Sequence, residues 1–336
     1  MPTYVVTGGA GFIGSNFVRL ALAQRPDLRI VTIDLLTYAG NLENLEGVPA
    51  DRHTFVRADI TDPDAMRGAV PDGADALVNF AAETHVDRSI LGPLAFVRTN
   101  VAGTQVLLDA ARARGVGRFL QVSTDEVYGS LEPGEPAFTE ASPLRPSSPY
   151  AASKAGADLL VLAAHRTYGQ DVVVTRCSNN YGPHQFPEKL IPLMLSNALE
   201  GEPLPVYGDG RQVRDWIFTD DHSRAILAVL GGGQPGAVYN IGARSEQKNL
   251  DVVRAILAAV GRPESLIRFV SDRPGHDRRY AIDPTRLETE LEWRPQTAFE
   301  DGLARTIQWY REHEGWWRRV KDGSYREFYE AWYGRR

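Results

Sequence analysis

The sequence contains one cysteine, Cys177, among 336 residues. A single thiol cannot build an internal disulfide framework or a cysteine-based zinc site. The histidines are scattered without an H-x-x-x-H pair, so we expect no metal site. No apolar run reaches the roughly 18 residues of a membrane span, and the chain opens on a strand-like segment rather than a signal peptide. We therefore expect a cytoplasmic protein with no membrane partner.

An excess of positive charge is also missing. The net charge is -6, and only four of the 37 basic residues are lysines. Because general nucleic-acid binding draws on a basic field, we expect no nucleic-acid partner, and any anionic ligand must be held by local groups. The chain is otherwise of ordinary globular composition, with 43% hydrophobic and 24% charged residues. At about 150 residues per domain, its length predicts roughly two domains, or one large domain with an appended lobe.

Short β-branched apolar runs alternate with helix-like segments through the first half of the chain. They occupy residues 4–7, 29–33, 54–57, 76–80, 119–123 and 172–176. Continuous apolar strands separated by helices predict a parallel sheet that is covered on both faces. We therefore expect an α/β fold with a doubly wound, parallel-sheet Rossmann domain.

Proline and glycine crowd the thirty residues after Arg176, which indicates that a second, mostly helical lobe begins there. Residues 206–218 suggest a hairpin around Gly208-Asp209-Gly210, and residues 237–241 suggest a buried strand that could rejoin the first sheet. Four tryptophans fall in the last 28 residues, and we expect them to anchor the C-terminal helices. They are Trp309, Trp316, Trp317 and Trp332.

The first strand leads into a glycine-rich turn and a helix-like segment at residues 15–24, the context of a dinucleotide-binding site. The turn fits G-x-G-x-x-G from Gly9 or G-x-x-G-x-x-G from Gly8, and both place a pyrophosphate at the helix N-terminus. Asp34 ends the second strand 20 residues after Gly14. A carboxylate there accepts from the ribose hydroxyls and opposes a 2′-phosphate, so we expect NAD. Asp59 and Ile60 could reach the adenine, or could form a turn before a helix.

Tyr150 and Lys154 are spaced i, i+4 in a helix-like segment at residues 150–167 and so share one face. A nearby ammonium favours the phenolate that could accept a hydroxyl proton. The same spacing also fits a plain amphipathic helix. In the run 123–129, Asp125 and Glu126 fit two compatible interpretations: a catalytic acid pair, or acids in a first helical turn that a Ser123-x-x-Glu126 capping box begins. Cys177 ends a predicted buried strand and fits a core thiol better than a nucleophile.

Five motifs together resemble one family. They are T-G-G-A-G-F-I-G at 7–14, A-A-E-T-H-V-D-R-S at 81–89, N-V-A-G-T at 100–104, S-T-D-E-V-Y-G at 123–129 and Y-A-A-S-K at 150–154. The chain resembles the dTDP-glucose 4,6-dehydratases, sugar-nucleotide enzymes of the extended short-chain dehydrogenase/reductase family, from the first strand to about Arg311. The run 123–129 best distinguishes this family from the related epimerases, because the epimerases lack the acid pair. Leu35 and Thr84 depart from residues common in the family, although Thr84 keeps a hydroxyl.

The resemblance implies a dehydration that begins with oxidation, because the C5 hydrogen of glucose is acidic only beside a C4 ketone. NAD takes hydride from C4 while Tyr150 accepts the hydroxyl proton and Thr124 hydrogen-bonds the C4 oxygen. Glu126 then removes the C5 proton, protonated Asp125 donates to the departing C6 hydroxyl, and hydride returns to C6. Two adjacent carboxyls should titrate apart, which keeps an acid beside a base. Lys154 completes the implied catalytic set.

The resemblance also implies binding residues. Those expected at the cofactor are Gly8, Gly11, Phe12, Ile13, Gly14, Asp34, Leu36, Thr37, Asp59, Ile60, Ala81, Ala82, Thr99, Tyr150, Lys154 and Asn180. Those expected at the nucleotide sugar are Thr84, Thr124, Asn179, Lys189, Leu190, Pro205, Val206, Tyr207, Arg214, Asn249, Asp272, Arg273, Pro274, Gly275 and His276. Lys189 and Arg214 would supply the positive charge that a diphosphate needs. As alternatives, Arg214 could pair with Asp215 or Asp209, and His276 could merely mark a turn.

The expected division is an NAD-binding domain at residues 1–178, to which residues 216–243 return, and a sugar-nucleotide-binding domain at 179–336. The resemblance further implies a homodimer joined by a four-helix bundle from the segments after Asn100 and Tyr150. Two rival functions stay open. One is another sugar-nucleotide dehydratase, epimerase or decarboxylase of the same fold; the other is a non-catalytic dinucleotide sensor.

Overall fold

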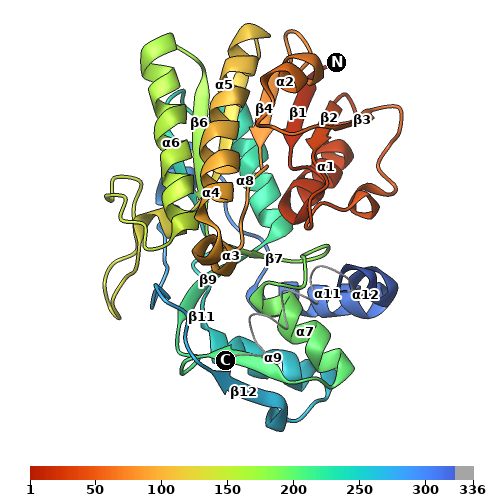
Figure 1. Cartoon of the computed structure of the whole chain (residues 1–336), viewed down its shortest axis with the longest axis vertical. Coiled ribbons are helices and arrows are strands. Elements are labelled where there is room, and N and C mark those ends of the chain that lie inside the picture. The colour runs from red at the N-terminus through yellow and green to blue at the C-terminus, as the bar shows by residue number, and fades with distance from the viewer. Residues whose placement is uncertain (322–336) are drawn as a thin grey trace.

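The computed structural model describes residues 1–321, and its largest element is a seven-stranded parallel sheet (Figure 1). The strand order is β10-β6-β5-β4-β1-β2-β3, with every neighbouring pair parallel. Its strands are β1 Thr3–Thr7, β2 Arg29–Asp34, β3 His53–Arg57, β4 Ala76–Asn79, β5 Arg118–Thr124, β6 Val172–Cys177 and β10 Val238–Ile241. All six strands predicted for the first half form within a residue or so of their expected ends. The fold class is confirmed.

Helices cover both faces of this sheet. The α-helices of both lobes are α1 Phe12–Gln24, α2 Pro63–Ala69, α3 Val86–Leu91, α4 Pro93–Phe96, α5 Thr104–Ala113, α6 Pro149–Tyr168, α7 Leu190–Glu200, α8 Thr219–Gly232, α9 Asn249–Val260, α10 Thr285–Glu290, α11 Phe299–Glu312 and α12 Glu314–Lys321. Other helical segments are η1 Leu42–Leu45, η2 Val97–Gly103, η3 Asp125–Tyr128 and η4 Glu264–Leu266. One apolar cluster joins the sheet to α1 and α8, and another joins it to α2, α5 and α6. Both faces are therefore dry, which explains the continuous apolar strands.

The second lobe lies below the sheet in Figure 1, where α7, α9 and α11 surround two small sheets. One sheet has the order β11-β9-β7, with β7 at Asn179–Tyr181, β9 at Val213–Phe218 and β11 at Glu246–Lys248. The other pairs β8 Leu204–Tyr207 with β12 Ile267–Val270 in parallel. The predicted hairpin at 206–218 is wrong. A turn does form there, with Gly208 and Gly210 at positive φ, but β8 and β9 pair with strands distant in sequence instead of with each other.

The chain crosses between the two lobes more than once. After β9 it returns to the first sheet through α8, which packs on α1, and through edge strand β10. Residues 216–218 of the expected return lie in β9 and so belong to the small sheet. Conversely, Leu287 of α10 and Trp293 join the core of the large sheet. Sequence-distant segments therefore fix the position of one lobe against the other.

The C-terminal tryptophans that the structure describes pack into the second lobe. Trp316 and Trp317 are buried in its core, with Trp309 packed against them, and the Trp316 indole donates to Asn44 Oδ1 at 3.0 Å. These three act as the expected anchors, while Trp332 lies outside the described residues. Within residues 1–321, none of the helices combines the length and apolarity needed to cross a bilayer.

Asp221 provides a direct test of how α8 holds the second lobe. Its carboxylate is fully buried and accepts the backbone N–H groups of Gln296 at 2.8 Å and Thr297 at 2.9 Å, just before α11. Asp221→Asn replaces an acceptor with a donor and leaves a buried N–H without a partner, which should cost about 1–3 kcal/mol. The control Asp220→Asn breaks only an exposed pair with Arg305 and should cost less than about 1 kcal/mol. Thermal melts of both variants check this; equal losses would contradict it.

Candidate active site

A cavity of about 470 Å³ lies between the carboxyl edge of the large sheet and the second lobe. The ends of β1, β2, β4, β5 and β6 reach it from one side, and α7, β8 and β9 reach it from the other. Ligands of open α/β sheets bind at this edge. The cavity is also within the size range of small-molecule sites.

The glycine-rich turn forms one end of the cavity. Gly8 has a φ of +69°, and a Cβ at this position would lie 2.6 Å from the backbone nitrogen of Ala81. A Cβ on Gly14 would lie 2.3 Å from the Gly8 oxygen. The backbone is thus packed too closely for side chains, and α1 begins here without an acidic residue in its first turn. This is a cradle for an anionic group, as a pyrophosphate requires.

Asp34 lines the cavity at the end of β2 and is buried. Its two oxygens accept the backbone N–H groups of Ala10 at 3.0 Å and Leu36 at 2.8 Å, so the carboxylate also ties the glycine turn to β2. Leu36 itself does not line the cavity. With a φ of +56° it turns back against the hydrophobic core, and Leu35 lines the cavity in its place. Asp59 and Ile60 both line the cavity, and Asp59 also accepts from Thr61 N, so the two interpretations of this pair coexist.

Tyr150 and Lys154 lie on the cavity side of α6 and are almost completely buried. Lys154 Nζ donates to the Val122 carbonyl at 2.6 Å, which ties α6 to β5. Phe96 packs edge-on against the Tyr150 ring, with centroids 6.3 Å apart. Burial raises the pKa of Tyr150 well above its usual value, although a hydrogen bond with Thr124 opposes the rise. Burial by the protein alone therefore favours the protonated phenol.

Asp125 and Glu126 are brought to one cavity because the chain leaves the strand between Thr124 and Asp125. The turn η3 begins at Asp125, and its N-cap is Thr124 Oγ1, which accepts from Glu126 N at 3.3 Å. The cap is thus Thr124 rather than Ser123, the residue that a capping box would use. The turn reconciles the catalytic and capping interpretations, since both acids line the cavity.

The two carboxyls lie in different electrostatic surroundings. Burial raises the pKa of Asp125 well above its usual range, and the charges of Glu126 and Asp215 raise it further. Burial also raises the pKa of Glu126, but Arg273, Lys189 and Arg214 oppose that rise. Burial therefore favours the protonated form of both carboxyls, and the effect is stronger at Asp125, where a neighbouring negative charge adds to it, than at Glu126, where three cations oppose it. The pair offers a proton donor beside a proton acceptor.

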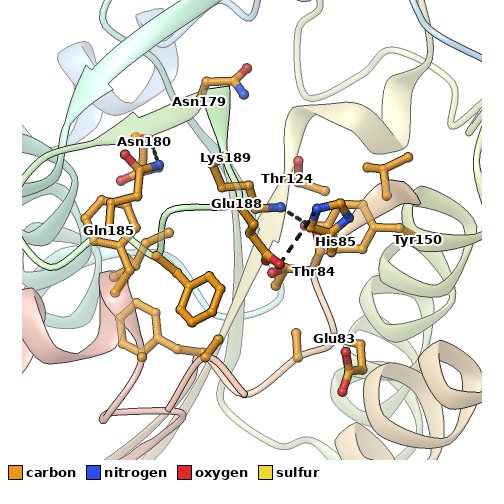
Figure 2. Close-up of a pocket in the computed structure, with 18 of the residues that line it drawn as sticks. Glu83, Thr84, His85, Thr124, Tyr150, Asn179, Asn180, Gln185, Glu188 and Lys189 are labelled. Atoms are coloured by element: carbon orange, nitrogen blue, oxygen red, sulfur yellow. Dashed lines mark hydrogen bonds and ion pairs between the residues drawn. The ribbon is translucent and has the colours of Figure 1, made fainter. Parts of the chain in front are cut away.

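Those three cations come from the second lobe. Lys189 Nζ crosses the cavity to the Thr84 carbonyl at 2.7 Å, as Figure 2 shows. Arg214 donates to backbone carbonyls of Val213 and Asp277, with its guanidinium 4.2 Å from the Tyr280 ring centre, so it pairs with neither Asp215 nor Asp209. Arg273 contacts Asp87 at 3.4 Å. A concentration of positive charge on this wall suits a diphosphate.

The remaining expected residues divide into two groups. Those that line the cavity are Gly8, Gly11, Phe12, Ile13, Gly14, Thr37, Ala81, Ala82, Thr84, Thr99, Asn179, Asn180, Leu190, Pro205, Val206, Tyr207, Asn249 and His276. Asp272, Pro274 and Gly275 do not line it. Asp272 instead orients His276, whose Nδ1 lies 2.6 Å from Asp272 Oδ1, so this histidine does more than mark a turn. Gly275 turns away at a φ of +66°.

Sequence reasoning missed several polar residues of the cavity, notably Asp87, His85 and Glu188. Tyr207 donates to Asp87 at 2.9 Å, and His85 Nε2 lies 3.7 Å from Glu188, whose pKa burial raises to about 7. Figure 2 shows Glu188 and Lys189 pointing across the cavity toward His85 and Thr84. Asp87 and His85 fall inside a quoted motif and Glu188 precedes one of the four lysines, which were the available signals. Among residues 1–321, no group of histidine, cysteine and acidic side chains could hold a metal ion.

Comparison with known proteins gives one consistent result. The family model described as GDP-mannose 4,6 dehydratase matches residues 5–306. The dTDP-glucose 4,6-dehydratase of Xanthomonas campestris pv. campestris (strain B100) is 53% identical, over 97% of this chain and 98% of that protein. The crystal structure of the dTDP-glucose 4,6-dehydratase DesIV from Streptomyces venezuelae, with NAD and a second ligand bound, is 54% identical with a TM-score of 0.92, over 95% of this chain and 100% of that one. The dTDP-glucose 4,6-dehydratase of Bacillus anthracis str. Ames, in complex with NAD, is 46% identical with a TM-score of 0.88, over 96% and 100%.

The glycine turn can be tested against a glycine of the same conformation. Gly8→Ala combines the strain of positive φ with a clash against backbone, whereas at Gly73, with a φ of +65°, an added Cβ would meet nothing within 4 Å. Gly73→Ala should therefore cost only the conformational strain of about 1–2 kcal/mol. Gly8→Ala should cost more and should also abolish retention of a dinucleotide through purification. Melting temperature and the nucleotide released on denaturation measure both effects; a Gly8 variant that retains dinucleotide would refute the close-approach argument.

Proposed function

This chain belongs to the dTDP-glucose 4,6-dehydratase family, and on that premise we propose that its cavity converts dTDP-glucose to dTDP-4-keto-6-deoxyglucose and water. The observation that carries the proposal is the acid pair Asp125-Glu126, which lines the cavity with unlike electrostatic surroundings beside Tyr150 and Lys154. An oxidoreductase or epimerase has use for the tyrosine and lysine, but an elimination also needs an acid and a base.

The cavity residues fit NAD. The Gly8–Gly14 turn and the N-terminus of α1 would hold the pyrophosphate, and Asp34 would accept from the ribose hydroxyls. The cofactor set that we propose is the expected one, with Leu35 in place of Leu36 on the cavity wall. When bound, NAD supplies a positive nicotinamide ring that favours the Tyr150 phenolate, takes up hydride from C4 of the sugar and later gives it back to C6.

The chain's own groups move the protons. Tyr150 accepts the C4 hydroxyl proton while Thr124 hydrogen-bonds the C4 oxygen, and the buried Lys154 ammonium stabilises the phenolate. Once C4 is a ketone, Glu126 removes the C5 proton as general base. Asp125 donates its proton to the C6 hydroxyl, which leaves as water. As C6 is reduced, protonated Glu126 returns its proton to C5, which completes the 4-keto-6-deoxy sugar. The proton that Tyr150 gains balances the proton that Asp125 loses.

The second lobe would bind the nucleotide diphosphate. We assign the diphosphate to Lys189, Arg214 and Arg273, whose charges face the cavity. Tyr207, Asn249 and His276 line the same region beyond them. We therefore propose that residues 179–215 and most of those after 243 recognise the substrate, and that residues 1–178 with α8 and β10 bind NAD.

We also propose a homodimer. Large apolar side chains are exposed along the adjoining helices α3, α4, η2 and α6, and they are Leu91, Leu94, Val97, Leu159 and Tyr168. Exposed large apolar side chains on adjoining helices favour a protein interface there. Three of these side chains precede Asn100 and the other two lie on α6, so the proposed interface uses α3, α4 and the start of η2 together with α6. A cytoplasmic location remains the proposal from sequence.

Mass spectrometry of the product tests the reaction. Purified protein incubated with dTDP-glucose and no added cofactor should release one water per sugar without net accumulation of NADH. Tyr150→Phe should lower turnover by about 10²–10⁴-fold while sparing bound NAD, because only the proton acceptor is lost. Tyr239→Phe, which removes a hydroxyl bonded to Glu290 from edge strand β10, should leave the rate unchanged. An unchanged substrate mass with altered sugar stereochemistry would favour an epimerase instead.

The two carboxyls predict the pH profile of turnover. Glu126 must be ionised, so the rate should fall as pH drops through its pKa, which lies above the usual glutamate value. Asp125 must be protonated, so the rate should also fall as pH rises through its strongly raised pKa. Asp125→Asn should remove the alkaline limb and Glu126→Gln the acid limb, each with a loss of about 10²–10⁴-fold. A profile whose limbs survive both substitutions would reassign the acid and the base.

A further inference from the structure

Arg176 is a charged residue inside β6, a strand whose side chains are all buried. It does not line the cavity and lies behind its wall. Its guanidinium has two side-chain partners. Nε donates to Asp158 Oδ2 at 2.9 Å, and a terminal nitrogen donates to the Tyr128 hydroxyl at 2.9 Å. The guanidinium therefore connects α6 with η3.

The first connection leads to Lys154. Asp158 lies four residues after Lys154 in α6, on the same helix face, and is fully buried. Burial lowers the pKa of the Lys154 ammonium, and the negative charge of Asp158 opposes that effect. The positive charge of Arg176 in turn opposes the rise that burial causes in the pKa of Asp158, and so favours its charged form. Lys154 is thus held by the Val122 carbonyl on one side and by the field of an anchored anion on the other.

The second connection leads to the acid pair. Tyr128 is the last residue of η3, the four-residue turn that begins with Asp125 and Glu126. Its hydroxyl accepts from Arg176 and donates to Asn240 Oδ1 of β10 at 2.8 Å. Its ring stacks on Phe138 with centroids 5.1 Å apart. The far end of the turn is therefore pinned, which fixes where its first two residues place their carboxyls.

We propose that Arg176 is a positioning residue that sets the Tyr150–Lys154 pair and the Asp125–Glu126 pair in register with each other, through Asp158 and Tyr128. This inference rests on the proposed function. One bound sugar must meet the first pair at C4 and the second pair at C5 and C6. A displacement of one pair relative to the other therefore slows one step selectively, and about 1 Å of misplacement can cost 10²-fold in rate.

Isotope effects can separate the two connections. Both substitutions preserve shape: Asp158→Asn removes the negative charge of the first connection, and Tyr128→Phe removes the hydroxyl of the second. Turnover should fall by about 10- to 100-fold in each variant. With Asp158→Asn, the isotope effect on kcat should increase for substrate deuterated at C4, because oxidation becomes slower. With Tyr128→Phe, it should increase for substrate deuterated at C5, because elimination becomes slower.

Matched controls come from the same sheet. Asp171→Asn breaks the Arg118–Asp171 pair, 3.0 Å apart, which lies where β5 and β6 begin, at the ends away from the cavity. Tyr239→Phe removes a buried hydroxyl bonded to Glu290. Both should leave the two isotope effects unchanged. Loss of water from dTDP-glucose by the unaltered protein tests the proposed function separately.

Two results would overturn the positioning role even if the unaltered protein is a dehydratase. The first is a fall in rate without the step-specific isotope effects, or with the same step slowed in both variants. The second is loss of the folded state in both variants, measured by thermal melting, because Asp158 and Tyr128 would then serve stability alone. If Asp158→Glu, which keeps the negative charge, recovers part of the rate lost in Asp158→Asn and the isotope effects of the unaltered protein, the charge has a role.

Discussion

Withdrawal from water is the constraint on which the site depends. Asp125, Tyr150 and Lys154 are each less than a tenth exposed. Burial raises the pKa of the carboxyl and of the phenol and lowers that of the ammonium, and so favours the neutral form of each group. A site made only of the first lobe would therefore hold neutral acids. Glu126 keeps a lower pKa than burial alone allows because Arg273, Lys189 and Arg214 reach it from the second lobe. The acid-base asymmetry exists only where the two lobes meet, which explains why the chain crosses between them repeatedly.

The sequence was most informative about the large sheet, for a physical reason. Strands buried on both faces must be largely apolar, so β1, β2, β4, β5 and β6 stand out without knowledge of their partners. The small sheets give no such signal. Gly208 and Gly210 do form a turn, but β8 finds its partner in residues 267–270 and β9 finds its partners in residues 179–181 and 246–248. Local turn chemistry predicts reversal of the chain, whereas pairing is decided by tertiary packing.

The same distinction separates the site residues. Those at strand ends and in the glycine turn could be predicted because a parallel sheet brings its carboxyl ends to one edge. Residues in irregular segments could not. Leu36 and Gly275 sit at positive φ and do not line the cavity, which a motif alone does not indicate. Asp87 and Glu188 were overlooked because their cavity positions arise from contacts more than a hundred residues distant, with Tyr207 and Tyr38 respectively.

Arg176 breaks the rule that made the sheet predictable, since it places a cation in a buried strand that is otherwise uncharged. A buried ion pair is weak evidence of stability, because well-packed apolar residues of similar volume often stabilise a core at least as well. Removal of one partner of the Arg176–Asp158 pair would leave the other charge buried alone and would lower the free energy of unfolding by about 3–5 kcal/mol, so each residue requires the other. Stability therefore does not account for a charged pair at this point. The positions of Lys154, one turn along α6, and of the acid pair, at the other end of η3, do account for it.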